Sequence, residues 1–209
     1  MKKRSGLWAA LVAGILAWQP TLAHENHQQH ATPSPHAGQT RVSLADAVLL
    51  DQHGQEVDLR KGVIAERVVV VDFFYTSCTS YCPVASAAMA RVAQKLGDRL
   101  GKEVVLVSIT VDPARDTPAR IAAYSAQFSN DPGWAWLTGS RRNVQSVLKG
   151  FGAYSANFED HPAMVLVGGR SADNWIRLNG SPDPALVLKG IEQVQQRDRL
   201  AGKLTREAK

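Results

Sequence analysis

The chain has only two cysteines, Cys78 and Cys82, among its 209 residues. They can form at most one disulfide within the chain. A closed zinc site usually takes four protein ligands, so two thiols make zinc the weaker metal candidate. No cysteine follows the apolar run near the N-terminus, which excludes a lipoprotein anchor.

Apolar runs long enough to span a membrane are also missing. The run of residues 7–18 has 12 residues, against the roughly 20 that a spanning helix needs. It follows the basic residues 2–4 and precedes small residues that end at Ala23, a pattern typical of a cleaved signal peptide. We therefore expect residues 1–23 to be a signal peptide. The mature protein should be soluble and periplasmic, without a permanent membrane anchor; an uncleaved anchor is the alternative.

The sequence has no basic cluster with interleaved aromatic side chains, which argues against nucleic acid as a partner. The formal net charge is +5, but residues 1–23 carry three basic side chains and no acidic one. The mature chain is thus close to neutral, and its charge says little about its partners.

Residues 24–40 contain no aliphatic side chain larger than alanine. Such a segment cannot bury enough apolar surface to fold, so we expect a disordered, His-rich tail. The tail is either a site for a soft or borderline metal ion or a polar leader that happens to contain histidine. Its four histidines are His24, His27, His30 and His36.

From residue 41 onward, apolar strand-like runs alternate with amphipathic segments, and no repeat or second domain is evident. The order predicts an α/β, thioredoxin-like fold, with a mixed central sheet flanked by helices and an N-terminal β-hairpin extension. We expect this domain over residues 41–199 and a C-terminal tail over 200–209. The expected elements are a hairpin at 47–59, strands at 67–75, 103–111, 134–139, 163–168 and 174–180, and helices after residue 82 and at 116–128, 140–151 and 183–200.

The helix that follows the strand of residues 67–75 should bury one face against the sheet. Pro83 indicates that this helix begins near Cys82, because proline is tolerated in the first turn, where its missing N–H is not needed. The side chains expected on the buried face are Val84, Ala87, Ala88, Val92 and Leu96.

This placement puts Cys78 just past the carboxyl end of the strand and Cys82 at the start of the helix. Free N–H groups and the helix dipole favour an anion there, so a thiolate should have a lowered pKa. The pair closes a loop of only a few residues, so a disulfide between them would add little stability. A structural disulfide is therefore disfavoured, and a redox dithiol or a pair of metal-binding thiolates remains.

Three residues separate the cysteines, whereas thioredoxin-type oxidoreductases have two, which favours metal without deciding the matter. Thiolates prefer soft ions such as Cu(I). We predict His161 as the third ligand, because it lies in a loop entering a strand, where thioredoxin-like folds bring a second loop against the dithiol. Taken alone, such a histidine is more often a surface residue. The other histidine of the folded region, His53, lies in a polar turn.

Four stretches occur in the order seen in one known family: FFYTSCTSYCP, VSITVDPARDTPARIAAY, WLTG and DHPAMVLVGG. Over roughly residues 44–194 the chain resembles the Sco/SenC family of copper-binding, thioredoxin-like proteins. The resemblance implies a copper ion held by Cys78, Cys82 and His161. It also implies service to assembly of the dinuclear copper centre of cytochrome c oxidase, by copper transfer, by thiol reduction or by both.

The chain departs from the family between its cysteines. Many members have Pro-Asp there, and this chain has Thr79, Ser80 and Tyr81. The missing carboxylate removes a negative charge that would bear on partner recognition and redox poise. After the histidine, Pro162 stands in a pattern similar to the cis-proline of thioredoxins.

The run DPARDTP invites a catalytic interpretation, but a structural role is favoured. Asp116 or Thr117 should cap a helix, the following proline should lie in its first turn, and Arg115 should pair with a carboxylate. Asp160 either orients the ring of His161 or caps a turn.

The function expected from the sequence is that of a periplasmic copper-binding metallochaperone, whose partner is a copper-acceptor protein such as an oxidase subunit. The alternative is a thiol:disulfide oxidoreductase with Cys78 and Cys82 as its catalytic dithiol, acting on the cysteines of a copper acceptor or another thiol–disulfide partner. A second alternative is a copper buffer that uses the His-rich tail.

Overall fold

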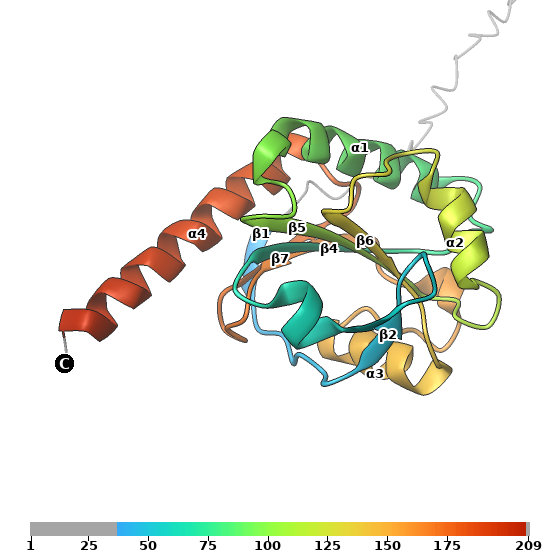
Figure 1. Ribbon diagram of the computed structural model, residues 1–209, viewed down its shortest axis with the longest axis horizontal. Coiled ribbons are helices and arrows are strands. Elements are labelled where there is room, and N and C mark those ends of the chain that lie inside the picture. Colours follow the sequence, from blue (N-terminus) through green and yellow to red (C-terminus); the bar gives the residue numbers. More distant parts are fainter. Residues whose placement is uncertain (1–36, 208–209) are drawn as a thin grey trace, which may run out of the picture. The chain divides into compact units, whose positions relative to one another are not determined.

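The computed structural model describes residues 37–207 (Figure 1). The expected signal peptide and the four histidines of the tail lie outside these residues. The elements are, in chain order, β1 (Ala37–Thr40), β2 (Val48–Leu50), β3 (Glu56–Asp58), the π-helical turn η1 (Leu59–Ile64), β4 (Val68–Phe74), α1 (Tyr81–Leu96), the 3-10 turn η2 (Gly97–Arg99), β5 (Val104–Thr110), α2 (Pro118–Ser125), β6 (Trp134–Leu137), α3 (Arg141–Phe151), the 3-10 turn η3 (Phe158–Asp160), β7 (Met164–Gly168), β8 (Trp175–Asn179) and α4 (Pro184–Glu207).

Six strands form a mixed sheet in the order β1-β8-β7-β4-β5-β6. Strands β4, β5 and β6 are parallel, whereas β7 pairs antiparallel with β4, β8 with β7 and β1 with β8. Parallel neighbours need a crossover connection, and α1 and α2 provide it between β4 and β5 and between β5 and β6. This topology confirms the α/β fold with a mixed central sheet that the sequence predicts.

The central strands β4 and β5 are buried along their whole length. Unbroken valine-rich runs are typical of strands covered on both faces. Helices α1, α2 and α4 cover one face, and α3, η1 and the hairpin β2–β3 cover the other (Figure 1). Side chains alternate along a strand, so Val70 and Phe74 pack under α1 whereas Val71 and Phe73 pack on the opposite side.

Helix α1 begins where the sequence predicts but buries a different face. Val92 and Leu96 are buried as expected, whereas Val84 is 61% exposed and Ala87 is exposed as well. An α-helix turns by about 100° per residue, so steps of four residues from Val84 drift across the helix surface instead of following one stripe. The stripe that is buried consists of Cys82, Ala85, Ser86, Met89, Val92, Ala93 and Leu96.

Both ends of the domain extend beyond the expected boundaries. Residues 37–40, assigned to the disordered tail, form β1, which pairs with β8 through its backbone although its side chains are mostly exposed. At the other end, α4 continues to Glu207 through the stretch expected to be a tail, and beyond Val194 its side chains are mostly exposed. Within residues 37–207, no helix combines the length and apolarity that crossing a bilayer requires.

The expected hairpin is present as the antiparallel pair β2–β3. The carboxylate of Asp51 closes its turn by accepting hydrogen bonds from the backbone N–H groups of His53 and Gln55. Leu50 and Thr138 exchange two backbone hydrogen bonds, which attach the hairpin beside β6. His53 is exposed in this turn.

Candidate metal and redox site

The two cysteines lie where β4 leads into α1. Cys78 is in the connecting loop and Cys82 is in the first turn of the helix. Both are free thiols, with only 8% and 1% of their surfaces exposed. The backbone N–H of Cys82 donates a hydrogen bond to the sulfur of Cys78 across 3.3 Å. The start of the helix thus stabilises a negative charge on Cys78, as the sequence indicates.

The two thiols differ strongly in acidity. Burial alone would raise the pKa of Cys78, but hydrogen bonds from the Cys82 thiol, from the backbone of Cys82 and Ser80, and from Tyr75 lower this pKa to about 7. Burial raises the pKa of Cys82 to about 12, and Cys78 and Asp72 add to the rise. The lowered pKa expected from the sequence is therefore found at one sulfur only. At neutral pH, Cys78 is partly thiolate and Cys82 is a thiol.

The loop that carries Cys78 is anchored by Asp116. The buried carboxylate accepts hydrogen bonds from the backbone N–H of Thr76 at 3.1 Å, from the hydroxyl of Thr76 at 2.5 Å and from the hydroxyl of Thr110 at 2.5 Å. It therefore ties this loop to the end of β5. The cap of α2 is Thr117, so the structural role expected for this run is confirmed, with Asp116 holding the loop and not the helix.

A second buried carboxyl group, Asp72, lies in β4 on the face of the sheet that α1 covers. It accepts a 2.5 Å hydrogen bond from the hydroxyl of Ser108, which in turn accepts a bond from the indole N–H of Trp134 at 2.9 Å. Burial raises the pKa of Asp72 to about 7, although the bond from Ser108 opposes the rise. The sequence patterns predict no role for this residue; the available signal was a single charged side chain inside an apolar strand.

His161 lies in the loop between η3 and β7, where the sequence places it. Its ring packs edge-on against Tyr75, with 6.1 Å between the ring centroids. Burial lowers the pKa of His161, with a smaller opposing effect from the backbone of Pro162, so the ring is neutral at pH 7. Its Nδ1 atom is buried and makes no hydrogen bond within the described part of the chain.

The structure decides two points about the neighbours of His161 that the sequence leaves open. The carboxylate of Asp160 accepts a 3.0 Å hydrogen bond from the side chain of Asn157, so it serves the turn and does not orient the imidazole. The peptide bond before Pro162 is trans, as are all peptide bonds of residues 37–207.

The structure brings together two of the three predicted metal ligands. Among residues 37–207, no group of three or more His, Cys, Asp or Glu side chains is close enough to hold a metal ion. Tyr75 contacts both parts of the predicted site, because its hydroxyl interacts with Cys78 and its ring packs against His161. The histidine is thus linked to the dithiol through Tyr75, and its role as a ligand stays a prediction.

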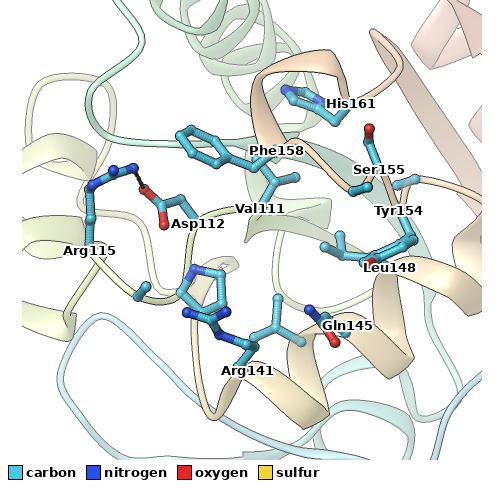
Figure 2. Close-up of a pocket in the computed structure, with 15 residues that line it drawn as sticks. Val111, Asp112, Arg115, Arg141, Gln145, Leu148, Tyr154, Ser155, Phe158 and His161 are labelled. Carbon is cyan, nitrogen blue, oxygen red and sulfur yellow. Dashed lines mark hydrogen bonds and ion pairs between the residues drawn. The ribbon is translucent and has the colours of Figure 1, made fainter.

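A cavity of about 290 Å³ opens beside His161 (Figure 2). Arg115 lies at its rim, paired with Asp112 across 2.9 Å as the sequence predicts, and its guanidinium lies 5.3 Å from the ring centroid of Phe158. Figure 2 shows Arg141 and Gln145 on the opposite side of the cavity from Phe158 and His161. The floor is apolar and is formed by Val111, Val144, Leu148 and Ala153.

Residues 39–180 of the chain match the family SCO1/SenC. The protein belongs to the SCO1/SenC family. Its sequence is 28% identical over 144 residues to the protein SenC of Rhodobacter capsulatus, covering 69% of this chain and 63% of that one. It spans 38% of the longer mitochondrial SCO1 homolog 1 of Arabidopsis thaliana.

Solved SCO1/SenC structures share the fold. The crystal structure of Arabidopsis thaliana ScoI with copper bound is 25% identical, with a TM-score of 0.60 over 73% of this chain and 99% of that one. BsSco, a member of the Sco family of cytochrome c oxidase assembly proteins in which a disulfide switch is identified, is 23% identical, with a TM-score of 0.60 over 76% of this chain and 96% of that one. These likenesses confirm the thioredoxin-like fold.

Proposed function

We propose that the protein is a periplasmic copper-binding metallochaperone of the Sco/SenC type, in which Cys78 and Cys82 hold copper and His161 supplies a third ligand. The recipient is a copper-acceptor protein such as a subunit of cytochrome c oxidase. The observation that carries the proposal is the pair of adjoining free thiols at the start of α1, one of them with a pKa of about 7, in a chain of the SCO1/SenC family.

The donor atoms suit copper chemically. Thiolate sulfur is a preferred ligand of Cu(I), and Cys78 is already partly ionised at neutral pH. A metal ion favours the thiolate form of Cys82 as well, because it takes the place of the proton that Cys82 donates toward Cys78. Loading with copper should therefore release protons, and the metal should pass to the acceptor by exchange of thiolate ligands.

The protonation state of His161 suits a role as the third metal ligand. A histidine ligand must be neutral, and burial lowers the pKa of this ring, whose buried Nδ1 has no partner within residues 37–207. Since the described residues hold no preformed three-ligand group, coordination by His161 requires His161 and the dithiol to come closer together.

The test is an anaerobic titration of Cu(I) into the reduced full-length protein against a chromophoric chelator. We expect one tightly bound equivalent, which is lost in both Cys78→Ser and Cys82→Ser. A disulfide cannot donate two thiolates, so air-oxidised protein should bind no copper at this site and should recover binding after mild reduction. Reduced protein that binds no copper there would overturn the proposal.

A second function, thiol:disulfide oxidoreductase, is favoured by the difference in acidity between the thiols. The Cys78 thiolate would attack a disulfide of the partner, forming a mixed disulfide and releasing one partner thiolate. Cys82 would then lose its proton and attack the sulfur of Cys78, releasing the second thiolate. The partner gains two electrons and the dithiol becomes a disulfide. Accumulation of a mixed disulfide in Cys82→Ser, without copper binding in the wild type, would establish this function instead.

The third candidate, a copper buffer based on the His-rich tail, concerns residues outside the described part of the chain. Its test is the same titration on a variant that lacks residues 24–36. Residues 37–40 should be kept, because they form β1 and pair with β8. If stoichiometry and affinity collapse in this variant, the tail is the principal site; if they persist, the thiols are.

A further inference from the structure

The cavity beside His161 carries an uncompensated positive charge. The guanidinium of Arg115 is paired with Asp112, which is almost fully buried. Arg141, the first residue of α3, is exposed and has no hydrogen bond or ion pair within residues 37–207. The positive end of the α3 dipole adds to its charge. The guanidinium of Arg141 is therefore available to bind an anion that enters the cavity.

The rest of the cavity suits an apolar group more than a charged one. The four floor residues are between 0% and 7% exposed and present aliphatic carbon: Val111, Val144, Leu148 and Ala153. Gln145 and Ser155 add hydrogen-bonding groups to the lining. A volume of about 290 Å³ is at the lower limit of small-molecule sites and suits one or two side chains.

The cavity is continuous with the aromatic cluster that borders the dithiol. Phe158 and His161 both line it. Both also pack against Tyr75, with ring centroids 5.1 Å and 6.1 Å apart. The hydroxyl of Tyr75 interacts with Cys78. A group seated in the cavity therefore contacts Phe158 and His161, and both of these side chains pack against Tyr75, which interacts with Cys78.

We propose that this cavity is a docking site for the partner protein, taking an acidic side chain flanked by an apolar one, with Arg141 as the residue that recognises the carboxylate. Guanidinium and carboxylate form paired, charge-assisted hydrogen bonds, and the apolar neighbour of the acid fills the aliphatic floor. The inference rests on the proposed function, since it assigns the cavity to the protein that exchanges copper or electrons with the dithiol.

The experiment titrates the reduced, ¹⁵N-labelled full-length protein with the peptide acetyl-Gly-Leu-Glu-Leu-Gly-amide and follows amide resonances by NMR. We expect shifts at the floor residues Val144 and Leu148. Arg141→Gln should weaken binding at least about tenfold, the loss typical of a hydrogen bond to a charged group. Arg142→Gln is the matched control and should change the peptide affinity less than about twofold, because Arg142 is also exposed on α3 but does not line the cavity.

Several results would overturn the docking site. The first is that no amide resonance shifts at about 1 mM peptide. The second is that a peptide with lysine in place of glutamate binds equally well. The third is that Arg141→Gln and Arg142→Gln lose the same amount of peptide affinity. Acetate binding as tightly as the peptide would make the cavity a small-ligand site instead. A Cu(I) titration on the same samples separates the two proposals. A wild-type protein that binds copper but not the peptide counts against the docking site alone, and a wild-type protein that binds no copper counts against the proposed function.

Discussion

The backbone N–H of Cys82 donates to the sulfur of Cys78 across 3.3 Å, so one cysteine stabilises the charge of the other. Alkylation of Cys78 by iodoacetamide should therefore rise with an apparent pKa near 7, while Cys82 stays unreactive below about pH 9 because its own pKa is about 12. Rates measured against pH, with mass spectrometry to locate the label, check this. A fast reaction at neutral pH that survives in Cys78→Ser would contradict it.

Tyr75 should tune this acidity through its hydroxyl. Tyr75→Phe removes the group that interacts with Cys78 but keeps the ring contacts with Phe158 and His161. We expect the pKa of Cys78 to rise by up to about one unit, because a hydrogen bond to the charged form is lost. The alkylation profile measures the shift, with Tyr154→Phe on the exposed surface as control. An unchanged profile would remove the hydroxyl from this role.

Asp72 should make the stability of the fold depend on pH. Its pKa is raised from 3.8 to about 7 by burial, so between these values the folded state binds more protons than the unfolded state. The free energy of unfolding must then fall as pH rises from about 4 to about 7 and level off above. A shift of about three units corresponds to about 4 kcal/mol at most.

Asp72→Asn removes this titration. The free energy of unfolding of the variant minus that of wild type should therefore be larger at pH 8 than at pH 4.5, so the variant is relatively more stable at the higher pH, as measured by urea unfolding of reduced protein. Asp98→Asn, at an exposed position, is the control for the loss of a carboxylate. A difference between Asp72→Asn and wild type that is the same at both pH values would show that the carboxyl of Asp72 is not perturbed by burial.

The sequence predicts the elements of the domain well because their signals are local. The valine-rich run of β4 and Pro83 near the start of α1 place the two cysteines correctly. The edge strand β1 was not predicted, because it pairs with β8 through backbone groups and its mostly exposed side chains leave no apolar pattern in the sequence. The roles of Asp72 and Tyr75 were not predicted, because they depend on the face of the sheet on which Asp72 lies and on the neighbouring loop that Tyr75 contacts. These are tertiary facts that spacing along the chain does not encode.

Loss of His161 should weaken Cu(II) binding more than Cu(I) binding. Cu(I) accepts two thiolates alone, whereas Cu(II) favours nitrogen and additional ligands. We expect His161→Ala to change or abolish the sulfur-to-copper absorption band of the Cu(II) form while retaining one equivalent of Cu(I). His53→Ala, in the exposed hairpin turn, should leave both unchanged. An unaltered band in His161→Ala would remove this residue from the site.

The most direct test of the account is copper X-ray absorption on reduced full-length protein loaded with one equivalent of Cu(I). If Cys78 and Cys82 hold the metal, the spectrum shows two sulfur neighbours, keeps them when residues 24–36 are deleted and loses them in the double variant with both cysteines replaced by serine. A copper environment of nitrogen and oxygen alone in the wild type, unchanged by replacement of both cysteines, would contradict the account.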